Sequence, residues 1–311
     1  MRLIILAPLA IAVTIAVAGL LIGYKLIAPE RRSLTATPKA WGLQFEEFSV
    51  RGTAGTLRGW LIPTTSARGR EAPFLILVHG YGENRVSVYS SPRLRIDADI
   101  PCPFTMEPLV KSLARWANVI LYDQRAHGES EGRLSTFGPG EGEDIHRIVD
   151  YLVEEAGAEK IALVGWSMGG AAAIFEAADD PRVDALVVDS SYAVASDPIE
   201  NAARRMGYPI WLMTLGKWGA RFLGVDLTKV RPIDQIGRIA QPILIIQGQR
   251  DPVVPVEQAQ RLQATAPNAQ LWILPDSGHC EAIARHTEEY VSRVGDVLRG
   301  ALGLEGGIEK E

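Results

Sequence analysis

The 311-residue sequence has few cysteines, few histidines and no excess of basic residues. Two cysteines, Cys102 and Cys280, are too few for a disulfide framework, and whether they pair stays open at this level. A formal net charge of -5 gives no basic surface for nucleic acid, so no nucleic-acid partner is expected. What is present, 47% hydrophobic and 22% charged residues, is the composition of a globular protein.

Charge is also missing from one long stretch near the amino terminus. Residues 3–22 are apolar or small apart from Thr14, and about 20 such residues suffice to cross a bilayer. A cleaved signal peptide, indicated by Arg2 and the small residues 16–18, is one alternative, and a buried core helix is another. We predict that residues 1–28 form a single-pass transmembrane anchor, with the lipid bilayer as a partner.

Two arguments about the side of the membrane on which the domain lies point in opposite directions. Lys25, Arg31 and Arg32 follow the apolar stretch and favour a cytoplasmic position for the domain behind them. Large domains are nevertheless exported despite such counts, and we expect this one on the extracytoplasmic side.

The rest of the chain divides into a linker, one domain and a tail. Residues 29–40 are polar with two prolines and suit a linker, residues 41–303 form the domain, and residues 304–311 form a tail. Short apolar runs in this domain alternate with helical patterns, after an initial hairpin at residues 43–63. Continuous apolar runs suit strands buried on both faces, so the pattern predicts an α/β fold with an eight-stranded, mostly parallel sheet and helices on both faces. The expected strands are residues 43–50, 57–63, 74–78, 119–122, 161–164, 185–188, 243–246 and 271–274, and the expected helices are residues 107–116, 143–155, 168–178, 256–264 and 281–299.

Two segments interrupt this alternation. Residues 87–103 are too long for a simple strand-to-helix connection, and residues 192–235 are longer still, with apolar and aromatic residues in a helical setting. Long insertions at such points are commonly lids or binding loops, so we predict a helical lid at residues 192–235, with ordinary core packing as the alternative.

The strongest chemical signal is Gly165-Trp166-Ser167-Met168-Gly169, which lies between a strand-like run and an Ala-rich helical pattern. Glycines allow the sharp strand-to-helix turn that holds a serine hydroxyl exposed, and the helix directs free backbone N–H groups at the reacting centre. Ser167 is therefore a candidate nucleophile, whereas a glycine-rich turn with an ordinary serine is the alternative.

A serine hydroxyl needs a base, and the base needs an acid that fixes its tautomer. Of the five histidines, His279 lies in the loop just after the last strand-like run, and His286 follows a few residues later within an expected helix. For His286, and likewise for His79, His127 and His146, a structural role is favoured. Asp251, after the seventh run, is the expected acid, with Asp189 as its rival.

Attack on a carbonyl creates an oxyanion that requires preorganised donors. The backbone N–H groups of Met168 and Tyr81 are the candidates, because Met168 follows the serine and Tyr81 lies in the glycine-rich loop His79-Gly80-Tyr81-Gly82. Trp166, Trp211 and Met213 are the candidate substrate-binding residues. No metal and no organic cofactor are expected.

Together these motifs resemble the α/β-hydrolase superfamily over residues 41–299, in particular its esterase and lipase-like branch that includes the monoacylglycerol lipase-like and ABHD-type serine hydrolases. Residues 123–130 are similar to the family turn Asp-x-Arg-Gly-His-Gly-x-Ser, with Ala126 in place of the glycine, and residues 138–144 resemble a segment of bacterial membrane-anchored members. The resemblance implies a Ser-His-Asp triad that cleaves a small-molecule acyl ester through an acyl-enzyme intermediate. The predicted anchor and the apolar segment at residues 192–235 suggest that this ester is lipid-like.

The same site serves thioesterases, peptidases and acyltransferases, which remain alternative enzymes. A catalytically silent scaffold that kept the fold is the non-enzyme alternative, although such a protein usually loses one of the three residues. Cys280, next to His279, is a conceivable nucleophile, but a small buried side chain is the better interpretation.

Overall fold

The computed structural model describes residues 2–89, 96 and 104–304 of the chain, and the side chains of residues 2–9 are not described. An eight-stranded sheet runs through the domain in the order β1-β2-β6-β3-β7-β8-β9-β10. The β1–β2 and β2–β6 pairs are antiparallel and the pairs from β6 to β10 are parallel. The strands are β1 (Glu46–Arg51), β2 (Thr56–Ile62), β3 (Phe74–Val78), β6 (Asn118–Tyr122), β7 (Ile161–Trp166), β8 (Val183–Asp189), β9 (Ile243–Gly248) and β10 (Ala269–Leu274). All eight predicted strands, and the mostly parallel sheet, are confirmed.

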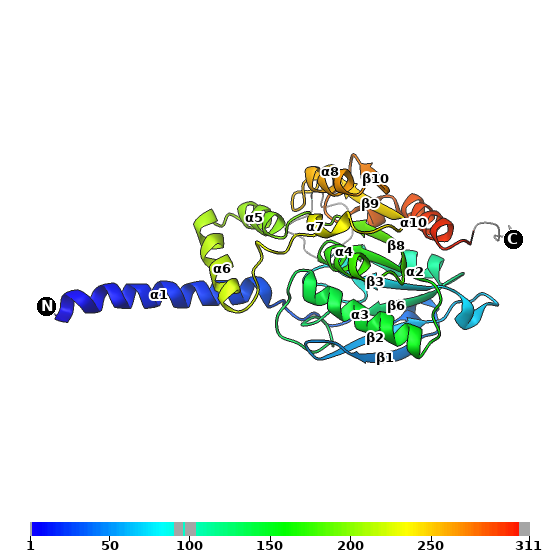
Figure 1. The fold of residues 1–311 in the computed structure, drawn as a ribbon, viewed down its shortest axis with the longest axis horizontal. Coiled ribbons are helices and arrows are strands. Elements are labelled where there is room, and N and C mark those ends of the chain that lie inside the picture. The colour runs from blue at the N-terminus through cyan, green and yellow to red at the C-terminus, as the bar shows by residue number, and fades with distance from the viewer. Residues whose placement is uncertain (1, 90–95, 97–103, 305–311) are drawn as a thin grey trace.

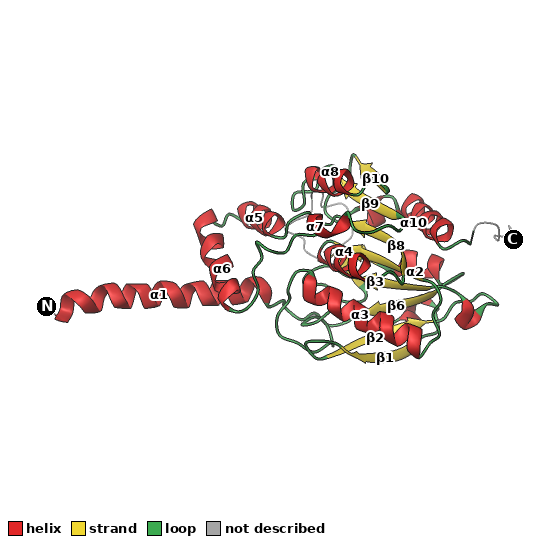
Figure 2. Ribbon diagram, viewed as in Figure 1, coloured by secondary structure: helices red, strands yellow, loops and turns green. Residues whose placement is uncertain are grey.

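Helices cover both faces of this sheet (Figure 2). On one face, α2 (Glu107–Leu113), α9 (Ala282–Arg285) and α10 (Thr287–Ala301) pack on alternate strand residues such as Leu77 and Val164. On the other, α3 (Pro139–Glu154), α4 (Met168–Asp179) and α8 (Val256–Thr265) pack on their neighbours in the same strands. Because side chains alternate along a strand, each buried strand supplies both cores.

Three predicted helices differ in their bounds by three residues or more, and one of them, α2, ends three residues earlier than expected. The helix expected at residues 281–299 is divided at His286, whose ψ of 44° is not helical, and α3 begins four residues earlier than expected. At that earlier start the Glu141 carboxylate accepts the Gly138 N–H, which satisfies a donor that the helix itself leaves unpaired. Short elements complete the chain: 3-10 helices at Pro38–Trp41 and Gly69–Glu71, and β4 (Ser87–Tyr89) paired with β5 (Phe104–Thr105).

Parts of the 87–103 insertion and of the predicted tail, with Cys102, lie outside the described residues. Cys280 is a free, buried thiol.

The amino-terminal helix α1 (Arg2–Ile27) extends away from the domain (Figure 1) and is long and apolar enough to cross a membrane. Near its domain end it meets the 192–235 segment, which forms α5 (Ser196–Arg205), α6 (Ile210–Phe222) and α7 (Ile233–Ile236). The helical content predicted for that segment is confirmed, and its role as a lid remains a prediction.

The polar residues after α1 are bound to the domain along their length, which a flexible linker would not be. The Arg31 guanidinium donates to the carbonyl oxygens of Gly128 and Gly132, both at 2.9 Å, and the Ser135 N–H donates to the Ile27 carbonyl at 2.7 Å. Asn84 donates to the Ser33 carbonyl at 3.2 Å. These bonds hold the end of α1 in a fixed place against the domain.

Candidate active site

Ser167 lies at the turn between β7 and α4, with a left-handed backbone (φ 52°) that is strained for any residue except glycine. The turn is possible because its flanking glycines touch backbone. A Cβ at Gly165 would lie 2.5 Å from the Gly169 carbonyl oxygen, and one at Gly169 would lie 2.1 Å from that of Val78. The two glycines of the motif are thus needed for packing.

The structure brings the three residues predicted to act together into one hydrogen-bonded chain. His279 Nε2 lies 3.1 Å from Ser167 Oγ, and His279 Nδ1 lies 2.7 Å from Asp251 Oδ2. All three follow strands: β7 for the serine, β9 for the aspartate and β10 for the histidine. Since these parallel strands end at one edge of the sheet, residues more than a hundred positions apart meet there.

Asp251 is fixed by more than the histidine. Its Oδ1 accepts the backbone N–H groups of Val253 and Val254, both at 2.8 Å, and its Oδ2 accepts the Gln247 amide at 3.1 Å. Donors on both oxygens hold the buried carboxylate in a fixed orientation toward His279.

The rival acid, Asp189, has other partners. Its carboxylate accepts the Ser190 hydroxyl at 2.9 Å and the Tyr290 hydroxyl at 3.0 Å, and burial raises its pKa to about 6. The Nδ1 contact of His279 is made by Asp251.

The protonation of His279 depends on two opposing effects. Burial lowers the pKa of the imidazole, but the Asp251 carboxylate outweighs it and holds the pKa above the ordinary value of a histidine. Asp251 therefore favours the state in which His279 has accepted a proton.

Two buried histidines, His79 within the loop at residues 79–82 and His127 outside it, fix this loop through hydrogen bonds. The Gln124 N–H donates to His79 Nε2 at 2.9 Å, and the Gly82 N–H donates to His127 Nε2 at 3.0 Å. Burial lowers the pKa of His79 to about 4 and that of His127 to about 3, so both rings are neutral acceptors near pH 7. Both therefore have structural contacts, as the sequence predicted.

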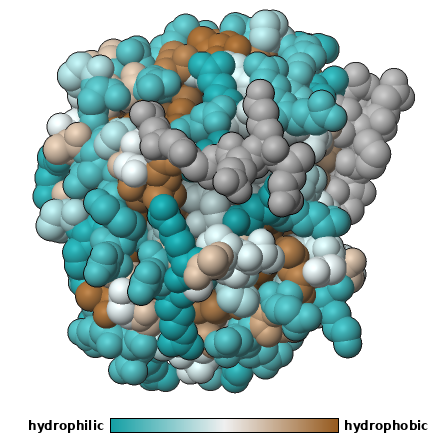
Figure 3. Space-filling model, turned by 90° about the vertical axis from the view of Figure 1, so that its right-hand side faces the viewer, coloured by the Kyte–Doolittle hydropathy of each residue, from teal (hydrophilic) through white to brown (hydrophobic). Residues whose placement is uncertain are grey.

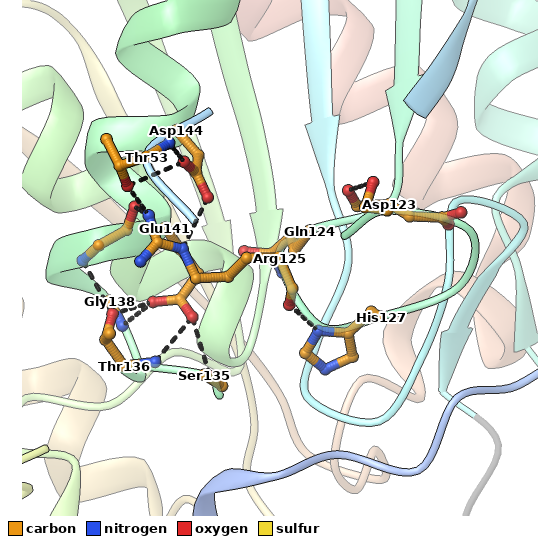
Figure 4. A network of polar contacts seen from close by, with 12 residues as sticks. Thr53, Asp123, Gln124, Arg125, His127, Ser135, Thr136, Gly138, Glu141 and Asp144 are labelled. Atoms are coloured by element: carbon orange, nitrogen blue, oxygen red, sulfur yellow. Dashed lines mark hydrogen bonds and ion pairs between the residues drawn. The ribbon is translucent and has the colours of Figure 1, made fainter. Parts of the chain in front are cut away.

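The turn that carries His127 is itself held by buried charges (Figure 4). Arg125 Nε contacts Asp144 Oδ2 at 2.6 Å, and Asp123 accepts the backbone N–H groups of Arg85 and Glu129, both at 2.8 Å. Ala126, which replaces the family glycine, has a φ of 64°, so an alanine occupies a backbone conformation that favours glycine.

A cavity of about 440 Å³ opens at Ser167 and His279. Gly80, Tyr81 and Met168 line it beside the serine, so both candidate oxyanion donors belong to residues of the cavity wall. The lining that comes from the 192–235 segment and α1 is apolar or aromatic except for Lys25, and Glu30, Arg32 and Glu83 add charged groups elsewhere in the lining. The apolar part includes Leu26, Ile199, Ala202, Met206 and Met213.

Of the three predicted substrate-binding residues, Met213 lines the cavity and the other two do not. Trp166 precedes the serine on β7, so its side chain points to the opposite side of the strand, into the core, where its Nε1 donates to the Tyr290 hydroxyl at 3.0 Å. Trp211 is 65% exposed on the outer surface of α6. The structure therefore does not bring Trp166 or Trp211 to this cavity.

Sequence reasoning missed the cavity residues from α1 and the loop before α3. Lys25, Leu26 and Phe137 line the cavity, and Phe137 stacks on Tyr81 at a ring-centroid distance of 4.8 Å. Nothing local in the sequence marks these residues, because α1 and the loop before α3 reach the cavity only through the fold.

Two further sets of reactive groups in the described chain are not part of the contacts from Ser167 through His279 to Asp251. Burial raises the pKa of Cys280 to about 11, which leaves its thiol protonated and a poor nucleophile at neutral pH.

His146, Glu176 and Asp180 offer ligand atoms within 4.8 Å of one another, but Asp180 already pairs with Arg182, and burial raises the pKa of Glu176 to about 9. This cluster lies apart from the cavity.

Comparisons with known proteins agree with this fold and with the class of site. A sequence profile described as the alpha/beta hydrolase family matches residues 75–293, and the chain belongs to that family. The structure is similar to the esterase Pf2001 of Pyrococcus furiosus, at a TM-score of 0.71 and 26% identity, covering 89% of this chain and 98% of that one.

Further relatives differ in what they support. The Salmonella typhi protein YfhR is 26% identical over 293 residues, 88% of this chain and 87% of that protein. An acylaminoacyl peptidase of Pyrococcus horikoshii, at 16% identity and a TM-score of 0.64, covers 86% of this chain and 43% of its own, and shows the fold alone. Family membership and the esterase neighbour together support hydrolase activity.

Proposed function

We propose that the protein is a serine hydrolase that cleaves carboxylic esters through Ser167, His279 and Asp251. The observation that carries the proposal is the continuous chain of contacts from Ser167 Oγ to His279 at 3.1 Å and from His279 to Asp251 at 2.7 Å. Its opening onto an apolar cavity of about 440 Å³ supports an acyl substrate with a lipid-like chain.

In the proposed reaction Ser167 Oγ attacks the ester carbonyl carbon while His279 Nε2 takes the hydroxyl proton. The negative charge on the carbonyl oxygen is stabilised by the N–H groups of Tyr81 and Met168. The C–O bond to the alcohol then breaks, and His279 returns the proton to the leaving alcohol. Water attacks the acyl-serine with His279 as base, which releases the carboxylic acid and restores Ser167.

We also propose that α1 anchors the enzyme in a membrane, with the domain on the extracytoplasmic side. The length and apolar composition of α1 support the anchor, and the export of large domains despite flanking basic residues is the argument for the side.

The proposed chemistry is tested with Ser167→Ala on a long-chain p-nitrophenyl ester, using Ser292→Ala on the outer surface of α10 as the matched control. Loss of the nucleophile should lower kcat/KM on the order of 10³-fold or more, and the control should retain its activity. Unchanged ester turnover in Ser167→Ala would exclude the mechanism.

A further inference from the structure

Exposed apolar side chains of the described part of the chain are confined to one region. The large apolar residues with high exposure all belong to α1 or to residues 206–222, at the end of α5 and along α6, and none comes from the rest of the described domain. The face of the molecule that points away from α1 is largely hydrophilic (Figure 3). The apolar surface of α1 and residues 206–222 comprises Ile11, Val13, Ile15, Val17, Leu21, Tyr24, Met206, Tyr208, Ile210, Trp211, Trp218 and Phe222.

The two parts of this surface are joined by glycines. A Cβ at Gly219 would lie 1.8 Å from the Gly19 carbonyl oxygen, and one at Gly23 would lie 2.3 Å from the Ala220 nitrogen. Two helices come this close only where small residues face each other, and small residues four apart on each helix form the usual close contact of membrane helices. Here Gly219 of α6 lies against Gly19 of α1, and Gly23, four residues further along α1, lies against Gly216, Gly219 and Ala220.

The position of the contact along α1 determines the depth of α6 relative to the predicted membrane span. At about 1.5 Å per residue, Gly19 lies about 24 Å along the helix from Leu3, close to the far edge of a hydrocarbon core about 30 Å thick. The contact thus falls at the domain end of the predicted span, where α6 crosses α1 (Figure 1). Tryptophan and tyrosine are enriched at this depth, and four such residues are exposed on α1 and on residues 206–222: Tyr24, Tyr208, Trp211 and Trp218.

The cavity borders the same elements. Leu26 of α1, Met206 at the end of α5 and Met213 of α6 line it together with Ser167. Ile27, at the end of α1, packs in one cluster with Met168 and Ala220. The helix that would enter the bilayer is therefore also part of the cavity wall.

We propose that α6 lies at the bilayer surface on the domain side of α1, and that the two helices form one membrane-contact surface from which an acyl ester lipid enters the cavity. The occupant of the exposed face of α6 is the lipid bilayer, because that face continues the apolar surface of α1. The entry of substrate rests on the proposed ester hydrolysis, whereas the position of α6 does not.

The position of α6 is tested in the full chain, reconstituted in phosphatidylcholine vesicles, with a nitroxide at Trp211→Cys in a Cys102→Ser background. Collisions with oxygen should be frequent and collisions with a water-soluble nickel chelate rare, as for a lipid-exposed group. The matched control is Glu288→Cys on α10, where the chelate should have free access. Equal access of the chelate to both positions would overturn the proposal, and so would protection from both reagents, which a second copy of the chain would give.

Substrate entry is tested with two esters, a water-soluble acetyl ester and a long-chain ester dissolved in the vesicle bilayer. Replacing Trp211, Trp218 and Phe222 by Ser should lower turnover of the bilayer ester on the order of 10-fold or more and leave the acetyl ester within about twofold. The control, Glu288→Ser with Glu289→Ser, should change neither rate. Equal loss on both esters, or no loss on either, would contradict entry from the bilayer.

The glycine contact gives a second variant. Gly219→Leu should separate α6 from α1 and reduce bilayer-ester turnover selectively, whereas Thr214→Leu, on the exposed side of the same helix, should not. Acetyl-ester turnover reports in each case that the domain has folded. If wild-type protein hydrolyses neither ester, the proposed function fails, and the nitroxide measurement still decides where α6 lies.

Discussion

The cavity has two walls of different construction. The wall with Ser167 and His279, with Asp251 buried behind it, is formed by loops after parallel strands and is held by backbone contacts and buried hydrogen bonds. The facing wall comes from α1 and the 192–235 segment, with apolar side chains and helices whose outer faces are exposed. In the proposed function the first wall provides the chemistry, and in the proposed membrane contact the second selects and delivers the substrate.

The largest effect should come from the base of the first wall. His279→Gln removes the acceptor for the serine proton, and we expect kcat/KM to fall on the order of 10⁴-fold or more for every ester. His286→Gln is the matched control, because that ring contacts Asp276 at the surface and should not affect turnover. Equal activity of the two variants would remove His279 from the mechanism.

Asp251→Asn should cost about 10⁴-fold in kcat by favouring the wrong tautomer of His279. It should also move the pH profile. A protonated imidazole cannot act as base, so activity is lost as pH falls through the pKa of His279, and that pKa is raised by Asp251. Without the carboxylate the pKa falls, and the acidic limb of kcat/KM against pH should shift to lower pH. The same exchange at Asp189, which contacts Ser190 and Tyr290, should leave this limb in place.

On the second wall the effect should depend on the substrate. Ala202→Trp places a large ring in the cavity and should reduce turnover of long-chain esters by about 10-fold or more, with a smaller effect on acetyl esters. The measurement is kcat/KM across esters of graded chain length, and Ala264→Trp on the exposed side of α8 is the control. A uniform loss at every chain length would mean that this wall does not distinguish acyl chains.

The smallest expected effect concerns the turn below the first wall. Ala126→Gly should raise the free energy of unfolding by about 0.5–1 kcal/mol, because glycine adopts the positive φ of this position without strain. Denaturant midpoints in detergent provide the measurement. Alanine-to-glycine exchange at Ala264, in the regular helix α8, should instead lower stability. A loss of stability in Ala126→Gly would show that the turn is not strained.

The two walls also differed in how far the sequence predicted them. Each strand has its own apolar run, and Ser167, Asp251 and His279 each lie just after such a run. Local pattern and chain order were therefore enough to predict the strands and to choose these three candidates. The second wall depends on contacts between α1 and α6, residues about two hundred positions apart, and single-sequence patterns carry no such information. Trp211 could not be placed for that reason, since an aromatic residue on an apolar helix has no fixed direction until the helices pack. For Trp166 the cause is different: alternation along β7 directs its side chain into the core.

The central claim is that Ser167 is the nucleophile, and covalent trapping tests it most directly. Full-length protein in vesicles is treated with a fluorophosphonate, digested, and the modified peptide is identified by mass spectrometry. We predict one adduct, on Ser167, that forms far more slowly in His279→Gln and is absent in Ser167→Ala. Folded wild-type protein whose Ser167 stays unmodified, or an adduct on another residue, would contradict the account.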